Sequence, residues 1–298
     1  MDVQDILKQL EVNEGTFPRE AVAQAIEQRE AVALELLRIL EYAHDNIEGI
    51  AERPDYFAHI YAMYLLAEFR EPRAYPLLIQ FFSTPGEITL DVTGDTVTED
   101  LGRILASVCD GDIEPIKSLI ENEQANEFVR YAAVTSLVAL VTCGEQKRDD
   151  VIAYFQSLFR GKLVRKCSHV WDALVSASTD LYPEELIGDI KLAYQHQLID
   201  SHFMGLESAE AVLSRDKDEV LFALTGSERF QLIDDAVSEM EWWSCFQPQG
   251  SPSRPDISDI PFPMSTPIVQ PETKKSKSRA KDKRKRKMAK ASRRKNRR

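Results

Sequence analysis

The feature that most constrains the fold of this chain is an apolar pattern at positions i, i+3, i+4 and i+7, which recurs four times. This spacing places apolar side chains on one face of a helix. The four stripes begin at Ala62, Leu101, Val134 and Val170, so their starts are 39, 33 and 36 residues apart. Such a period is typical of a two-helix repeat, in which each repeat buries its apolar face against its neighbours.

A second apolar stripe follows each first one after a short turn, as a two-helix repeat requires. These second stripes begin at Ala74, Ile113, Val151 and Leu186. The turns contain residues that end one helix or cap the next, namely Glu71-Pro72, Asp110-Gly111-Asp112, Cys143-Gly144, and Asp180 with Pro183. We therefore predict an all-α fold, a HEAT-like α-solenoid of about four central helix pairs.

Helical caps are expected at both ends of the four pairs. Helical patterns cover residues 3–11, 18–30 and 31–47 upstream, and 207–214, 218–224 and 228–243 downstream. In the last of these, one face would carry Phe230, Ile233, Val237 and Met240.

Two further segments differ from the amphipathic pattern. Residues 55–69 are apolar nearly all round, which predicts a helix enclosed by neighbours on every side. Residues 87–97 favour β structure but are interrupted by Gly94 and lie in the longest gap between repeats, so we expect an ordered insertion or loop there.

Composition excludes several classes of protein. With 298 residues and 43% apolar content the chain can bury a sizeable core, yet no apolar run approaches the ~20 residues that a membrane-spanning helix needs. The acidic start Met1-Asp2-Val3-Gln4-Asp5 differs from a secretion signal. Four separated cysteines argue against a disulfide scaffold or a CxxC zinc site. A cytoplasmic protein without membrane contact is expected.

Charge divides the chain into two opposite parts. Residues 272–298 contain 16 Lys and Arg against two acidic residues, a net charge of +14, whereas residues 1–271 have a net charge of -26. Seven of the 14 prolines fall between Pro248 and Pro271, where missing amide protons oppose helix and sheet. The predicted organisation is a helical-repeat domain over 1–246, a disordered proline-rich linker over 247–271 and a disordered basic tail over 272–298.

The basic tail is the strongest functional signal in the sequence. Its cations would neutralise phosphates and give salt-dependent affinity for nucleic acid, and the absence of aromatic residues there leaves no base stacking. We expect non-specific contact with RNA or ribosomes. The alternatives are a disordered end that only increases solubility, and contact with the acidic body. The residues involved would be Lys281, Lys283, Arg284, Lys285, Arg286, Lys287, Arg293, Arg294, Lys295, Arg297 and Arg298.

Several strings resemble a bacterial family of uncharacterised proteins. They are residues 65–76 (LLAEFREPRAYP), 98–106 (TEDLGRILA), 180–185 (DLYPEE) and 233–235 with 239–243 (IDD and EMEWW). The resemblance covers roughly residues 1–246 and implies a domain of unknown function with HEAT-like helical repeats, without a catalytic assignment. Some members of that family end in a SEC-C zinc tail, which this chain lacks because no cysteine follows Cys245.

Acidic residues form the most distinct polar group in the body. Asp91, Asp95, Glu99 and Asp100 precede one helix, and Asp110 and Asp112 follow it. A hard cation needs converging oxygens, but a helix of eight residues separates the two groups by roughly 12 Å. Capping of helix ends is the ordinary role, and a surface for a partner is the alternative.

Other residues have weaker functional patterns. Cys167 and His169 would point about 200° apart on a helix, so they would not bind one zinc ion together. Cys143, beside Gly144, is a conceivable nucleophile but is more simply a small packed residue. Trp242 and Trp243 either seal the last helix pair or form a docking point for a partner, where tryptophan is enriched.

Three hypotheses of function follow. The first is a non-enzymatic adaptor or scaffold that binds an unidentified protein partner through an acidic helical-repeat groove, uses the basic tail for nucleic acid, and needs no cofactor. It rests on paired repeats in a sequence without GxxxxGK[ST], GxGxxG, HExxH or GxSxG. The second is a metal-assisted hydrolase or lyase that uses the acidic residues of 91–112. The third is a nucleic-acid-binding protein that acts mainly through the tail.

Overall fold

The computed structural model describes residues 1–200 and 204–247, and within these ranges the fold is all-α. Two isolated β-bridges, Val12 with Tyr56 and Pro85 with Ala125, are the only β pairing in the described part of the chain. The predicted fold class, an α-solenoid of stacked helix pairs, is confirmed.

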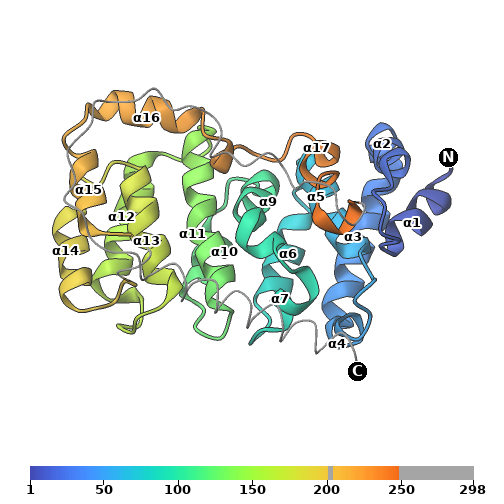
Figure 1. Cartoon of the computed structure of the whole chain (residues 1–298), viewed down its shortest axis with the longest axis horizontal. Coiled ribbons are helices and arrows are strands. Elements are labelled where there is room, and N and C mark those ends of the chain that lie inside the picture. The colour runs from blue at the N-terminus through green and yellow to red at the C-terminus, as the bar shows by residue number, and fades with distance from the viewer. Residues whose placement is uncertain (201–203, 248–298) are drawn as a thin grey trace, which may run out of the picture. The chain divides into compact units, whose positions relative to one another are not determined.

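Four central helix pairs follow one another along the chain, as the stripes predict (Figure 1). The first helices are α5 (Ala58–Glu68), α9 (Leu101–Val108), α11 (Glu127–Thr142) and α13 (His169–Asp180). Their partners are α6 (Ala74–Phe82), α10 (Glu114–Glu121), α12 (Arg148–Ser157), which continues into the π-helical turn η1 (Leu158–Lys162), and α14 (Ile187–Gln195). Successive first helices contact one another in chain order and thus form one layer.

Further helices cap the four pairs at both ends. Upstream lie α1 (Val3–Glu11), α2 (Arg19–Glu27), α3 (Arg29–Asp45) and α4 (Ile47–Ala51), and downstream lie α15 (Leu206–Val212) and α16 (Lys217–Thr225). Local capping fixes two of their starts, those of α1 and α16, because the side chains of Asp2 and Asp216 accept hydrogen bonds from the amides of Asp5 and Glu219.

The core is densest around α5 and the α9–α11 contact. Every residue from Ala58 to Ala67 is buried, which confirms the prediction of a helix enclosed on all sides. Gly102 marks the close approach of α9 to α11, since a Cβ at this position would lie 2.9 Å from the carbonyl oxygen of Ala132. A side chain therefore does not fit between these two helices without a shift of backbone.

Residues 87–97 form an ordered insertion between the first and second helix pairs, one of the two predicted alternatives, but the insertion is helical and not a loop. The segment forms two short helices, α7 (Ile88–Thr93) and α8 (Thr96–Glu99), separated at Gly94 with a positive φ of 57°. Most of its β-branched residues are buried, in helices that contact α4 and α11, and this packing outweighs their preference for strand.

The prediction of one continuous helix over 228–243 is wrong. The segment consists of a 3-10 turn η2 (Glu228–Phe230), a non-helical stretch over 231–235, a short helix α17 (Ala236–Met240) and a second 3-10 turn η3 (Ser244–Phe246). The side chain of Asp235 accepts from the amide of Ser238 and so starts a new helix inside the expected one. Phe230, Ile233 and Met240 are buried, but not as one helical face.

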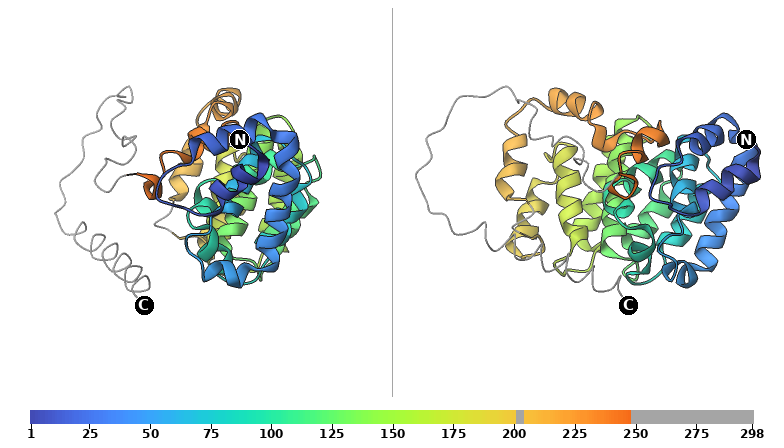
Figure 2. Two further views of the ribbon diagram at one scale, coloured as in Figure 1. Left: turned by 90° about the vertical axis from the view of Figure 1, so that its right-hand side faces the viewer. Right: turned by 45° about the vertical axis from the view of Figure 1, so that its right-hand side comes forward.

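The chain reverses direction after α15. In Figures 1 and 2, α16 leads back over the row, and the orange segment beyond it runs towards the N-terminal helices. Contacts of η2 with α11 and α9, and of α17 with α5 and α2, establish the same path. The last described residues thus lie against the first helices of the fold.

Candidate functional site

The most elaborate polar arrangement in the described residues holds the returning segment, here called the C-terminal strap (residues 228–247). The strap meets the ends of the first helices in reverse chain order. Arg229 pairs with Asp180 at the end of α13, and the carbonyl of Phe230 accepts from Thr142 at the end of α11. Further on, the strap contacts α9 and then α5.

The spacing of these contacts along the strap follows from the distance between neighbouring helices and from the rise per residue of an extended chain. Neighbouring helix axes lie about 8–10 Å apart, and an extended chain advances about 3.3 Å per residue. About three strap residues are therefore needed to pass from one helix to the next. The contacts of Phe230 with α11, Ile233 with α9 and Ala236 with α5 have this interval.

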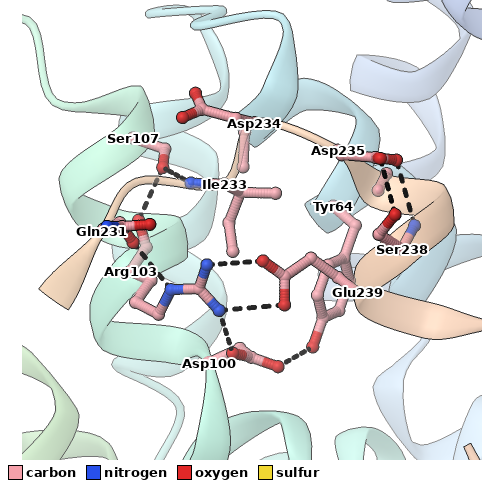
Figure 3. Close-up of polar contacts among 12 residues, drawn as sticks. Tyr64, Asp100, Arg103, Ser107, Gln231, Ile233, Asp234, Asp235, Ser238 and Glu239 are labelled. Carbon is pink, nitrogen blue, oxygen red and sulfur yellow. Dashed lines mark hydrogen bonds and ion pairs between the residues drawn. The ribbon is translucent and has the colours of Figure 1, made fainter. Parts of the chain in front are cut away.

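Arg103 on α9 is the centre of the arrangement (Figure 3). Its Nη1 lies 3.0 Å from Oε2 of Glu239 and 2.9 Å from Oδ1 of Asp100, and its Nη2 donates to Oε1 of Glu239. Its Nε donates to the carbonyl of Gln231 at 2.7 Å. One guanidinium thus binds a helix carboxylate, a strap carboxylate and the strap backbone.

These charges are largely removed from water. The side chains of Arg103 and Asp100 are 13% and 12% exposed, and that of Glu239 is 24% exposed. Burial alone would lower the pKa of Arg103, but the carboxylates of Glu239 and Asp100 outweigh it and raise that pKa above its usual range. Arg103 therefore keeps its positive charge inside this largely buried network.

Tyr64 on α5 completes the buried network. Its hydroxyl donates to Oδ2 of Asp100 at 2.6 Å, so both carboxylate oxygens of Asp100 are bonded. Burial, together with the neighbouring charge of Asp100, raises the pKa of Tyr64 well above its usual value. Tyr64 therefore remains a hydrogen-bond donor and links the strap network to the most buried helix.

Side chains of α5, of the turn that follows it and of α9 also bind the strap backbone directly. Ser107 accepts from the amide of Ile233 at 2.9 Å, and Glu68 accepts from the amide of Ala236 at 2.7 Å. Arg70 donates to the carbonyl of Ile233 at 2.6 Å and pairs with Asp234. These side chains replace the backbone-to-backbone hydrogen bonds that the segment would make if it were helical.

Aromatic side chains anchor the far end of the strap. Phe246 lies among Phe17, Phe57 and Tyr61, with ring centroids 5.4, 6.1 and 6.4 Å away. Trp243 packs edge-on against Tyr64 at 5.5 Å. We call the surface made by these residues of the repeats the strap-binding face. Its members are Phe17, Arg19, Phe57, Tyr61, Tyr64, Glu68, Arg70, Arg103, Ser107 and Thr142.

The structure separates the acidic residues that the sequence grouped together. Asp100 is part of the buried network, whereas Asp91, Asp95 and Glu99 are exposed on and beside α7 and α8. Burial and the neighbouring carboxylates of Asp100 and Asp95 raise the pKa of Glu99. The group does not converge on one point.

Asp110 and Asp112 have the ordinary turn-forming role. Asp110 accepts from the amide of Asp112, and Asp112 accepts from the amide of Glu114 at the start of α10. Among the residues that the structure describes, no three His, Cys, Asp or Glu side chains gather in a way that could hold a metal ion.

The two tryptophans differ in environment. Trp243 is partly buried against the strap-binding face, and Trp242 is 41% exposed. The pair therefore belongs to the strap and not to a helix that seals the last pair.

The predicted nucleic-acid-binding residues of the basic tail, between Lys281 and Arg298, lie outside the described residues.

The cysteine and histidine candidates have structural environments. The expectation of a small packed cysteine is wrong for Cys143, because this residue is exposed at the turn after α11. Partial desolvation of its thiol still raises its pKa, which disfavours the thiolate that a nucleophile requires. His169 Nδ1 lies 3.1 Å from Asp172, and the other carboxylate oxygen of Asp172 accepts from the amide of Asp200. His169 also stacks on Phe128 at 4.6 Å.

Two cavities lie beside Trp171, away from the strap. The larger, about 420 Å³, has Arg130 and Lys166 near Glu87, Glu123 and Glu127 in its lining. The smaller, about 270 Å³, is lined mainly by residues of η1, the following loop and α14. Neither lining concentrates one sign of charge, so neither defines a class of ligand as clearly as the strap-binding face does.

Sequence reasoning missed most residues of the strap-binding face. Glu68, Arg70 and Arg103 are ordinary polar residues of helix ends or faces, and their partners lie 128–168 positions away. One local signal was present, because Asp235 followed by Ser238 is a helix-start pattern within residues 228–243.

Comparison with known proteins supports the family resemblance. A family described as "Protein of unknown function (DUF1186)" matches residues 1–247. An uncharacterized protein of Chlamydia trachomatis serovar D is 42% identical over 244 residues, which are 82% of this chain and 96% of the relative. A second, from Chlamydia muridarum, is also 42% identical over 244 residues, covering 82% of this chain and 97% of the relative.

No solved structure matches this chain. Within the described ranges, no helix combines the length and the apolar character needed to cross a membrane. The family match spans the helical pairs and the strap together but leaves residues 248–298 outside. The chain belongs to this family of proteins of unknown function, DUF1186.

Proposed function

We propose that this protein is a non-enzymatic scaffold that binds a partner protein along the strap-binding face. The observation that carries the proposal is the way in which the repeats hold the strap. Side chains from three successive first helices bind the carbonyls and amides of a non-helical segment, through Glu68, Arg103, Ser107 and Thr142. A face that binds main-chain groups in this way is suited to extended peptides in general.

Stacked repeats are suited to this role because each helix pair adds one more set of contacts along an extended surface. The contacts in this protein come from side chains of rigid, mutually packed helices, so their positions are fixed before a partner arrives. The sequence predicts an acidic groove, but the charged side chains that donate hydrogen bonds to the strap are those of arginines.

Photo-crosslinking tests the proposal. A photoreactive amino acid is placed at Arg19 or Arg70, members of the strap-binding face whose side chains are 61% and 35% exposed, and separately at Leu34 or Leu192, which are exposed on α3 and α14. We expect the two positions on the face to yield the same crosslinked partner segment in cells that produce the protein, and the two control positions not to yield it. Equal products at all four positions, or none at the face, would contradict the proposal.

We further propose that the basic segment 272–298 attaches the scaffold non-specifically to RNA. The support is its net charge of +14 beside a body of net charge -26. Replacement of phosphate counterions by these cations would make the logarithm of the binding constant fall with the logarithm of salt concentration, with a slope of about -0.7 per phosphate contacted on single strands.

Fluorescence anisotropy with labelled single-stranded RNA measures this. The full chain should bind, and a variant with the Lys and Arg residues of 281–298 replaced by Gln should lose at least tenfold in affinity together with most of the salt dependence. Unchanged affinity in that variant would show that the tail is not the RNA-binding element.

A further inference from the structure

We propose, on the basis of the proposed function, that the partner segment is an acidic peptide that is extended at its start, forms a short helix where the strap has α17, and ends in an aromatic anchor, and that the C-terminal strap is its resident competitor. The strap shows which chemistry the strap-binding face accepts. The strap thus occupies the face as a peptide ligand that is part of the same chain.

Main-chain recognition makes the strap replaceable. The bonds from Arg103 to the carbonyl of Gln231, and to Ser107 and Glu68 from the amides of Ile233 and Ala236, involve atoms that every peptide has. A different segment in the same non-helical conformation would make the same bonds. These contacts fix the conformation of the occupant but not its sequence.

Charge selects the occupant. Three arginines of the strap-binding face each meet an acidic strap residue: Arg103 pairs with Glu239, Arg70 with Asp234 and Arg19 with Glu241. Only the Arg103 pair is largely buried, so it contributes most to selectivity, while the two exposed pairs are screened by water and salt. A peptide without a carboxylate at the Glu239 position would leave Arg103 buried with one partner fewer.

Aromatic packing supplies the anchor. Phe246 is 5% exposed among Phe17, Phe57 and Tyr61, at a distance of seven residues along the chain from Glu239. Desolvated aromatic residues of this kind dominate the binding energy of many interfaces. The preferred partner segment therefore has a buried aliphatic residue, acidic residues after it and an aromatic residue further towards its C-terminus.

The connection to the strap permits exchange without loss of the repeats. In α16, which leads into the strap, Val220 is the one buried residue, and Phe222 is 80% exposed. Release of the strap alone would expose Tyr61 and Tyr64 to water, which is unfavourable. Exchange for a second peptide that covers the same side chains avoids this exposure.

The test uses the full chain and a fluorescein-labelled synthetic peptide with the sequence of residues 228–247. In the wild type, the attached strap competes at an effective concentration on the order of millimolar. The double variant Glu239→Gln with Phe246→Ala weakens the attached strap and leaves the strap-binding face unchanged. We expect fluorescence anisotropy to show at least tenfold tighter binding of the peptide to this variant than to the wild type.

Two matched controls accompany the measurement. The double variant Glu210→Gln with Phe222→Ala makes the same chemical changes outside the strap, where Glu210 pairs with Lys191, and should bind the peptide as weakly as the wild type does. A labelled peptide that itself carries Glu239→Gln and Phe246→Ala should bind the strap variant at least tenfold more weakly than the native peptide. If the strap variant loses its helical circular dichroism, the single variant Phe246→Ala replaces it.

Hydrogen exchange over residues 228–247 reports whether the attached strap has been released. If exchange increases there but the native peptide binds no better than to the wild type, the inference is overturned. A variant that instead forms dimers by exchanging straps between copies would overturn it as well. Failure of peptide binding while crosslinking at Arg70 on the strap-binding face still captures a partner would reject the peptide class but leave the scaffold function standing.

Discussion

Arg103 on α9 holds Glu239 of the C-terminal strap with two hydrogen bonds, although the two residues are 136 positions apart in the chain. The same guanidinium binds Asp100, which in turn accepts from Tyr64 on α5. This network joins two successive repeats to the strap, and it makes Arg103 the residue on which the position of the strap most depends.

Loss of Arg103 should therefore destabilise the fold strongly. In the variant Arg103→Ala, the buried carboxylates of Asp100 and Glu239 lose their counter-charge, and removal of one partner from a buried pair costs about 3–5 kcal/mol. The control Arg38→Ala removes a pair whose arginine is 60% exposed and should cost less than about 1 kcal/mol. Urea unfolding monitored by circular dichroism compares the two, and equal losses would show that the Arg103 network has no special weight.

A methyl group at the α9–α11 contact should destabilise the protein. In Gly102→Ala the added Cβ would lie 2.9 Å from the carbonyl oxygen of Ala132 and 3.2 Å from Cβ of Thr135. Overpacking of this kind typically costs about 1–3 kcal/mol and here outweighs the helix preference for alanine. Gly188→Ala on α14, with open space around its Cβ, should be neutral or stabilising in the same thermal melts. A stable Gly102→Ala protein would mean that α9 and α11 are further apart.

His59 should make stability depend on pH. Its ring is fully buried, with Nε2 donating to the carbonyl of Val92 at 2.8 Å, and burial lowers its pKa from 6.5 to about 4. Between these two values the unfolded chain binds a proton that the folded chain does not, so stability present above pH 6.5 is lost as the pH falls towards 4. The slope from this one group is at most about 1.4 kcal/mol per pH unit.

Urea unfolding at several pH values between 7 and 4 measures this slope. The variant His59→Gln keeps an amide donor for Val92 but has no titrating ring, so its stability should change less steeply over the same interval. Equal slopes for the wild type and the variant would contradict the lowered pKa of His59. They would mean that the ring binds its proton as readily in the folded protein as in the unfolded chain.

The central helix pairs were predictable because their folding information is local. A stripe such as the one that starts at Val134 needs only neighbours three and four residues away to define a buried face. The same reasoning identified α5 as an enclosed helix, since few of its residues are polar.

The strap and α7–α8 were not predictable in the same way, because tertiary contacts decide their conformation. Residues 231–236 find backbone partners in Ser107, Arg103 and Glu68, which no local pattern reveals. Asp100 was identified as a notable residue, but its role depends on Arg103 and on a strap that the sequence reading placed in a helix.

The most direct test of the account is amide hydrogen exchange at Ile233 and Ala236 in the full-length protein. These two amides donate to Ser107 and Glu68, so their exchange should be at least a hundredfold slower than in an unstructured peptide, and Ser107→Ala should accelerate Ile233. Exchange of both amides at the rate of an unstructured peptide, while the amides of α5 remain protected, would contradict a strap bound along the repeats.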